Sequence, residues 1–176
     1  MKKSTILLIF IIYLASIVAV GFFGMASKVY DETKYVSLIE MSAQVENPEM
    51  MVWEDITESP TSKEKEYFLT VNFDKAILYK EDKYFVPITL IPFVSYDTGD
   101  VANSKEESIV YSSANAANTL KDSEGNISFL KNGEIIAYLT KQGALSVYAA
   151  DCGFVINVSP VKQGSAKVGA TIFVTT

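Results

Sequence analysis

Acidic side chains are the groups in this chain best suited to reaction chemistry, because two carboxylates can supply the acid and the base of glycoside hydrolysis. Four candidates lie in the first third of the chain: Glu40, Glu54, Asp55 and Glu58. Each lies in a loop-like or exposed context, and no spacing among them selects a pair. We therefore expect these carboxylates to be solvated surface groups.

Another set of acids falls in stretches that are typical of turns: Asp97, Asp100, Asp122 and Glu124. Oxygen ligands on adjacent loops are enough for a weak external Ca²⁺ site. The ordered spacing of a dedicated calcium loop is missing, and aspartate is also a favoured turn residue because it bonds to its own backbone. We expect ordinary turn chemistry here and assign no metal ligand.

Histidine and arginine are absent, and all 15 basic residues are lysine. A nucleophilic serine or cysteine therefore lacks its usual activating base, and no glycine-rich phosphate-binding motif occurs. Cys152 is the single cysteine, so no disulfide can form within this chain, and we expect it to be buried as a small apolar side chain. The sequence predicts no catalytic activity and no cofactor.

The charge balance after the first 27 residues is strongly acidic. Residues 28–176 carry 13 lysines against 21 acids, hence a net charge of −8. A surface of this kind repels phosphate backbones and anionic lipid headgroups. We therefore expect no nucleic-acid partner.

The N-terminal segment predicts a membrane anchor. Ile6 to Met25 is a run of 20 uncharged residues, 13 of them Ile, Leu, Val or Phe. As a helix it spans about 30 Å, the thickness of a hydrocarbon core. Lys2 and Lys3 before it favour a cytoplasmic N-terminus. The alternative is a cleaved signal peptide with its cleavage site near Ala26, although the apolar run is long for that role.

Beyond residue 27 the pattern changes to short alternating runs between turn residues, which indicates strands. In the clearest of them, Tyr67, Leu69, Val71 and Phe73 share one face. Similar runs are residues 84–94, 108–112, 126–130, 134–140, 144–149, 154–158 and 166–175. Asn132-Gly133 suits a tight hairpin turn. The spacing predicts an all-β sandwich.

Two regions are harder to interpret. Pro87 and Pro92 indicate that their strand is an edge or bends between sheets. Residues 35–45 read as a strand, while residues 46–65 read as a loop or tether. The apolar cluster that ends at Trp53 is too apolar for a bare linker, so we expect it to dock on the sandwich or on a partner.

Residues of about 74–159 resemble a bacterial immunoglobulin-like domain of the group-2 type. The segments that carry the resemblance are Ala76 to Tyr79, Ile88 to Pro92, Val110-Tyr111-Ser112-Ser113-Ala114-Asn115, Asp122-Ser123-Glu124-Gly125-Asn126, Ile127 to Leu130, and Gly133 to Thr140. The chain continues beyond Thr140 through more strands than the single closing strand of that pattern. The resemblance implies an adhesive or scaffolding module of the kind found on bacterial surfaces or phage particles.

Tyrosines on exposed strand faces make good binding anchors. Five tyrosines fall in predicted strands or beside them: Tyr84, Tyr96, Tyr111, Tyr138 and Tyr148. We expect most of them to be half-buried sheet residues. The sequence does not show which of them, if any, form a binding face.

The sequence thus predicts a transmembrane anchor (residues 1–27), a linker and extension with one or two strands (28–73) and an immunoglobulin-like β-sandwich (74–176). The expected function is a single-pass cell-membrane protein that displays an adhesion-type binding or scaffolding domain outside the cytoplasm, with a protein or glycan partner. The alternative is an accessory subunit of a membrane or cell-envelope assembly. A wall-active hydrolase is a third, weaker possibility.

Overall fold

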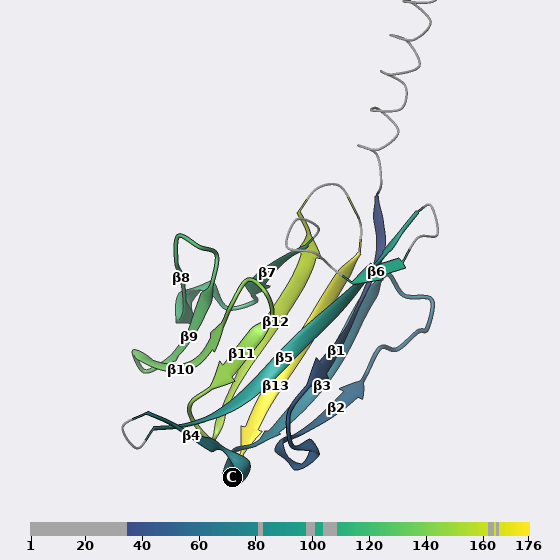
Figure 1. The fold of residues 1–176 in the computed structure, drawn as a ribbon. Helices are drawn as coiled ribbons and strands as arrows, with labels where there is room; N and C mark the ends of the chain where they lie inside the picture. The colour runs from purple at the N-terminus through teal and green to yellow at the C-terminus, as the bar shows by residue number, and fades with distance from the viewer. Residues whose placement is uncertain (1–34, 81–82, 98–100, 104–108, 162–163, 165) are drawn as a thin grey trace, which may run out of the picture. The chain divides into compact units, whose positions relative to one another are not determined.

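The structure, a computed structural model, describes residues 35–80, 83–97, 101–103, 109–161, 164 and 166–176. Residues 35–176 form one compact unit, which is all-β and consists of two sheets arranged as a sandwich (Figure 1). The predicted anchor lies outside the described residues. Within them, no helix has the length and apolar character needed to span a membrane.

The first sheet has β5 at its centre. Its main path runs, in spatial order, through β1 (Val36–Gln44), β5 (Lys83–Tyr96), β11 (Ala144–Val147), β10 (Glu134–Leu139), β9 (Ile127–Lys131) and β8 (Thr119–Lys121). Two short strands, β4 (Ile77–Lys80) and β6 (Val101–Asn103), also pair with β5. All pairings in this sheet are antiparallel.

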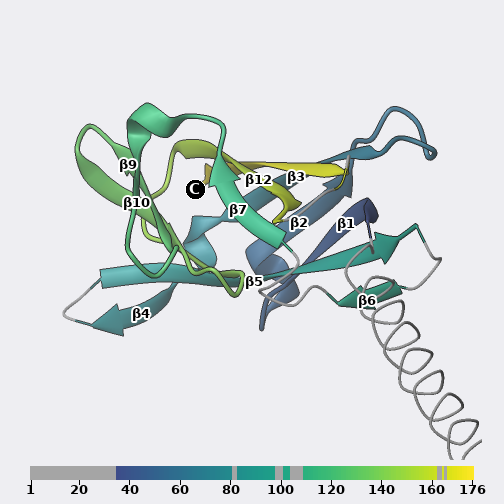
Figure 2. The same cartoon turned by 90° about the horizontal axis from the view of Figure 1, so that it is seen from above.

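The second sheet contains one parallel pairing. Its order is β2 (Met51–Asp55), β3 (Glu64–Asn72), β13 (Lys167–Thr175), β12 (Cys152–Pro160) and β7 (Ile109–Ser113). β3 and β13 run parallel, and the other pairs are antiparallel. Three short 3-10 helices connect strands: η1 (Pro48–Met50), η2 (Phe73–Lys75) and η3 (Ala116–Asn118). Figure 2 shows the layers from above, with β5 in the first and β3 and β12 in the second.

The core lies between the sheets and follows the period-two pattern of the sequence. Tyr67, Leu69 and Val71 share one face of β3, as predicted, and that face is buried, whereas Phe73 lies beyond the strand in η2. The rings of Phe129 and Phe154 meet across the two sheets with centroids 4.4 Å apart. Alternate residues thus face the core because successive strand side chains point to opposite faces.

The predicted strands are confirmed to within a few residues at each end, but the N-terminal region contributes more than expected. We predict one or two strands in residues 28–73, and the described part of that range contains β1, β2 and β3, each paired within a sheet. β2 escapes a pattern-based prediction because it is short and ends in Glu54 and Asp55. Its pairing with β3, rather than its own composition, makes it a strand.

The two prolines of β5 lie where the strand changes neighbours. β1 pairs with β5 from Thr89 to Tyr96, and β11 pairs with it from Val86 to Thr89. Pro87 lies before the stretch paired with β1, and Pro92 lies between the stretches paired with β11 and β6. β5 is therefore not an edge strand, and each proline occupies a position where one side of β5 lacks a paired strand.

The predicted Asn132-Gly133 turn is confirmed, since both residues have positive φ, 54° and 85°. These values match the two-residue turn that joins closely paired antiparallel strands, here β9 and β10. Gly143 also has a positive φ, 93°, in the turn before β11. A Cβ on Gly143 would lie 2.6 Å from the Leu90 carbonyl oxygen and 2.8 Å from Tyr111 Oη.

These two glycines give a matched test of the fold. Gly133→Ala should cost about 1 kcal/mol of unfolding free energy, because a Cβ there meets nothing within 4 Å and only the backbone conformation is penalised. Gly143→Ala should cost about 3 kcal/mol or more, since strain at the same φ is joined by a clash with β5. Denaturant unfolding measures both. Equal losses would contradict the packing of this turn against β5.

Candidate functional site

A groove of about 750 Å³ lies where β4, the start of β5, β10 and the residue after β11 come together. Its lining contains five aromatic rings, one aliphatic side chain and two opposite charges: Phe73, Tyr79, Lys83, Tyr84, Glu134, Ile135, Tyr138 and Tyr148. We call it the tyrosine groove. Figures 1 and 2 both show β4 and β10 on the same side of the sandwich. Its volume is in the range that holds a small ligand or a short segment of a larger one.

The groove's rings are supported from within the first sheet by Phe85. This half-buried ring meets Tyr79 edge-on, with centroids 5.2 Å apart, and stacks on Tyr148 at 6.3 Å. The backbone N–H of Tyr148 donates to the Ile136 carbonyl oxygen at 2.8 Å, which holds this residue against β10. Two tyrosines of the groove are thus positioned by strand pairing and ring contacts, a rigid arrangement suited to recognition.

A bulge in β10 brings Ile135 and Tyr138 into the same groove. Ile135 pairs with Leu130 of β9, but the next pair is Ala137 with Phe129, so Ile136 is an extra residue. Ile136 and Ala137 are both buried. In an unbroken strand, Ile135 and Tyr138 would point to opposite faces. The extra residue shifts the alternation by one position, so that the side chains of Ile135 and Tyr138 both line the groove. Bulges commonly re-aim side chains near functional sites.

One end of the groove is acidic. Partial burial of Tyr138, together with the nearby Asp122 and Glu124 carboxylates, raises the pKa of its hydroxyl. A tyrosine hydroxyl is neutral at physiological pH even without this shift, and a hydrogen bond with the Asp122 side chain also contributes to the raised pKa. On the groove rim, Lys83 and Glu134 are exposed and carry opposite charges.

Asp122 performs the turn chemistry predicted for it. Its Oδ1 accepts from the backbone N–H groups of Glu124 and Asn126, both at 2.9 Å, and its Oδ2 accepts from the Asn126 side chain at 2.8 Å. The Asn126 side-chain bond is the main reason that the pKa of Asp122 is lowered. Asp97 is exposed, while Asp100 lies outside the described residues. Across the described ranges, no three acidic or cysteine side chains gather closely enough to hold a metal ion.

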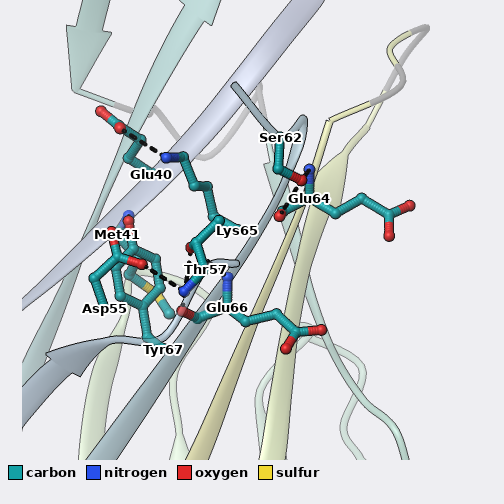
Figure 3. Close-up of polar contacts among 9 residues, drawn as sticks. All are labelled: Glu40, Met41, Asp55, Thr57, Ser62, Glu64, Lys65, Glu66 and Tyr67. Atoms are coloured by element: carbon teal, nitrogen blue, oxygen red, sulfur yellow. Dashed lines mark hydrogen bonds and ion pairs between the residues drawn. The ribbon is translucent and has the colours of Figure 1, made fainter. Parts of the chain in front are cut away.

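The four N-terminal carboxylates are exposed, as predicted. Figure 3 shows that Glu40 approaches Lys65, with Oε1 3.8 Å from Nζ, while Asp55 Oδ1 accepts from the Thr57 N–H at 2.9 Å. That bonding to Thr57 lowers the pKa of Asp55. The Glu40–Lys65 pair joins β1 of the first sheet to β3 of the second, whereas the Asp55–Thr57 bond is local to the end of β2.

The apolar cluster around Trp53 docks on the sandwich, which confirms one of the two expected outcomes. Met50 is buried, and Trp53 stacks on Tyr67 with ring centroids 4.9 Å apart. Tyr67 Oη in turn accepts from the Met41 N–H at 3.4 Å, a contact between β3 and β1 (Figure 3). The side chain of Lys65 is only 7% exposed. This end of the molecule is thus held together by contacts between the sheets.

The structure separates the five tyrosines singled out from the sequence. Tyr84, Tyr138 and Tyr148 line the groove, Tyr96 is half-buried elsewhere, and Tyr111 is a core residue. Sequence reasoning did not single out Tyr79 as a binding residue: it is the last residue of the short segment expected at residues 76–79 and carries no distinguishing pattern. No local signal predicts that Tyr79 and Tyr148 share a groove, because they lie far apart in the sequence and both contact Phe85 of β5.

Cys152 is buried, as predicted, and its Sγ donates to the Ala149 carbonyl oxygen at 3.2 Å. Burial raises the pKa of this thiol. The protonated form therefore predominates at neutral pH, which leaves a poor nucleophile.

Comparisons with known proteins return no match to a protein-family model, to a curated protein or to a solved structure.

Two buried tyrosines provide a matched stability test. Tyr111 Oη is buried with no hydrogen-bond partner among the described residues, so Tyr111→Phe should raise the unfolding free energy by about 1 kcal/mol. Tyr67→Phe removes an oxygen that accepts a hydrogen bond and should lower it by about 1 kcal/mol. Thermal and denaturant unfolding report both values. A destabilising Tyr111→Phe would mean that this hydroxyl has a partner.

Proposed function

We propose that this chain is a membrane-anchored binding protein. Residues 6–25 span the cell membrane with the N-terminus in the cytoplasm, and an immunoglobulin-like sandwich outside it binds a protein or glycan through the tyrosine groove. The observation that carries the binding role is the groove itself, because Tyr79, Tyr84 and Ile135 are each more than half exposed on a rigid framework. Exposed aromatic side chains on rigid elements are typical of binding sites.

The strand order supports an immunoglobulin-like assignment. Such domains place strands A, B, E and D in one sheet and C, F and G in the other. Here β1, β5, β11 and β10 follow the first order, and β7, β12 and β13 follow the second. On this assignment β1 is the first strand, so the domain begins well before residue 74, where the sequence resemblance alone puts its start.

The anchor proposal rests on the sequence. The apolar run ends at Met25, and the compact unit that includes the sandwich begins at Tyr35. Residues 28–176 carry a net charge of −8, which opposes adsorption of this part of the chain to anionic lipid headgroups. A spanning segment supplies membrane attachment that this surface does not.

Binding without catalysis fits the groove's chemistry. The chain has no histidine to act as a general base near neutral pH. Within the groove, Glu134 is an exposed carboxylate and Tyr138 has a raised pKa. These groups are suited to hydrogen bonding and stacking, which position a ligand without reacting with it.

An accessory subunit of an envelope assembly is the second candidate. β2 lies at the end of the second sheet, and its side chain Val52 is 59% exposed, while Ile56 just beyond the strand is 46% exposed. An edge strand with exposed apolar side chains can pair with another chain. Trp53 does not belong to this surface, since it packs on Tyr67.

Protease digestion of intact cells tests the topology, with a C-terminal tag on the full chain. We expect the tag to stay with the membrane and to be removed from outside. A positive control for cell integrity is a cytoplasmic protein that resists digestion in the same sample. Release of the tagged protein into the medium, shortened by about 26 residues, would replace the anchor by a cleaved signal peptide. A protected tag would place the domain in the cytoplasm and overturn the proposal.

The binding role is tested by an adhesion assay on cell fragments. Full-length protein in lipid nanodiscs should adhere to envelope-containing cell fragments, and Tyr84→Ala should reduce that adhesion. Tyr35→Ala is the matched control, because Tyr35 is 43% exposed and lies outside the groove. Equal adhesion by all three proteins would remove the groove as the binding site.

A further inference from the structure

The composition of the tyrosine groove restricts the ligand that it fits. Of the eight lining residues, five are aromatic, one is aliphatic, and the remaining two are Lys83 and Glu134. The cores of protein–protein interfaces share the aromatic enrichment of this groove, but they are depleted in lysine and glutamate. This groove instead combines flat rings with hydroxyl groups and with one charge of each sign.

We infer that the groove binds a neutral glycan, in particular a chain of pyranose rings joined through equatorial bonds. This inference rests on the proposed binding function of the same site. A pyranose with equatorial substituents presents its axial C–H groups as a flat apolar face, which matches an aromatic ring, while its hydroxyls point outward. The ligand therefore needs rings on the floor of the site and polar groups at its edge.

The edge of the groove supplies both kinds of hydrogen-bonding partner that a sugar hydroxyl requires. The Lys83 ammonium donates only, and the Glu134 carboxylate accepts only. The Tyr138 hydroxyl donates to the Asp122 carboxylate, and its oxygen can accept from a sugar hydroxyl. A sugar hydroxyl is itself a donor and an acceptor, so it can be satisfied by any of these three groups.

Charge selects a neutral glycan over charged ones. Lys83 and Glu134 balance one another at the rim, while Asp122 and Glu124 lie close to Tyr138 at one end. The side chain of Lys121 reaches the same turn, where its Cε lies 4.0 Å from the position of a Cβ on Gly125. An anionic glycan would meet a domain of net charge −8, which opposes its approach. Because Lys83 and Glu134 carry opposite charges at the groove rim, the groove also has no strong preference for a cationic ligand.

The rigid position of the rings makes such binding favourable. Phe85 contacts both Tyr79 and Tyr148, with ring centroids 5.2 and 6.3 Å from its own. Little side-chain freedom is lost when a ligand stacks on rings that are already fixed. Neutral glycans bind weakly at any single ring, so several ordered rings in one groove are needed.

The test is ligand-observed NMR saturation transfer on the full-length protein in nanodiscs. Cellotetraose is the expected ligand, and maltotetraose, whose axial linkages break the flat face, is the comparison. We expect saturation transfer from cellotetraose at about 10 mM or below, and weaker transfer from maltotetraose. Tyr84→Ala and Tyr148→Ala should each weaken cellotetraose binding about five- to tenfold, while Tyr35→Ala should leave it unchanged.

Salt dependence gives an independent readout. Binding of a neutral tetrasaccharide should change less than about twofold between 0.05 and about 0.5 M salt, because no ion pair forms with the ligand. A lysine-rich decapeptide serves as the probe for a cationic protein partner, and its binding would weaken steeply over the same range.

The outcomes separate this inference from the proposed function. No transfer from either tetrasaccharide, with adhesion to cell fragments still lost in Tyr84→Ala, would overturn the glycan and leave the groove as a site for another ligand class. Salt-sensitive binding of the peptide at the groove would identify a protein partner instead. Cellotetraose binding that Tyr84→Ala and Tyr148→Ala leave intact would also overturn the inference.

Discussion

The parallel pairing of β3 with β13 is the constraint on which the rest of the sandwich depends. The two strands are in register over nine residue pairs, from Glu64 with Lys167 to Asn72 with Thr175, although about one hundred residues separate them. β13 also pairs with β12, so it lies in the interior of the second sheet. The second sheet therefore cannot close until β13 is in place between β3 and β12, and long-range pairing of this kind is intrinsically slow to form.

The first sheet depends on β5 in a comparable way. This 14-residue strand pairs with four others, so it joins β1, the β4 hairpin and the β11–β10–β9 part of the sheet. Its two prolines are accommodated because each occupies a position where one side has no paired strand. The same strand supplies Phe85, which supports Tyr79 and Tyr148. The strand that organises the sheet thus also fixes the geometry of the groove.

Much of the fold is predictable from the sequence, because strand side chains alternate and turns require particular residues. Leu69 and Val71 reveal β3 by their spacing, and Asn132-Gly133 reveals the turn between β9 and β10. The strands β2, β6 and β8 are short and owe their conformation to their partners, so their own residues carry little signal. The groove is harder still. The β10 bulge places Ile135 beside Tyr138, although strict alternation would put them on opposite faces. No local sequence pattern marks the position of the bulge.

The tyrosine groove leaves the side chains of Tyr79 and Tyr84 more than half exposed. Burying the rings of Tyr79 and Tyr84 would stabilise the sandwich. It would also lower the risk of aggregation, which exposed apolar surface promotes. The chain limits that risk by other means, with lysine and glutamate at the groove rim and a strongly acidic surface overall. The proposed binding role accounts for exposed, ordered rings that are surrounded by charges, because such rings are available for contact with a ligand. The rigidity of these rings then explains why such contact can be specific, because the ligand meets a surface whose shape is set before binding.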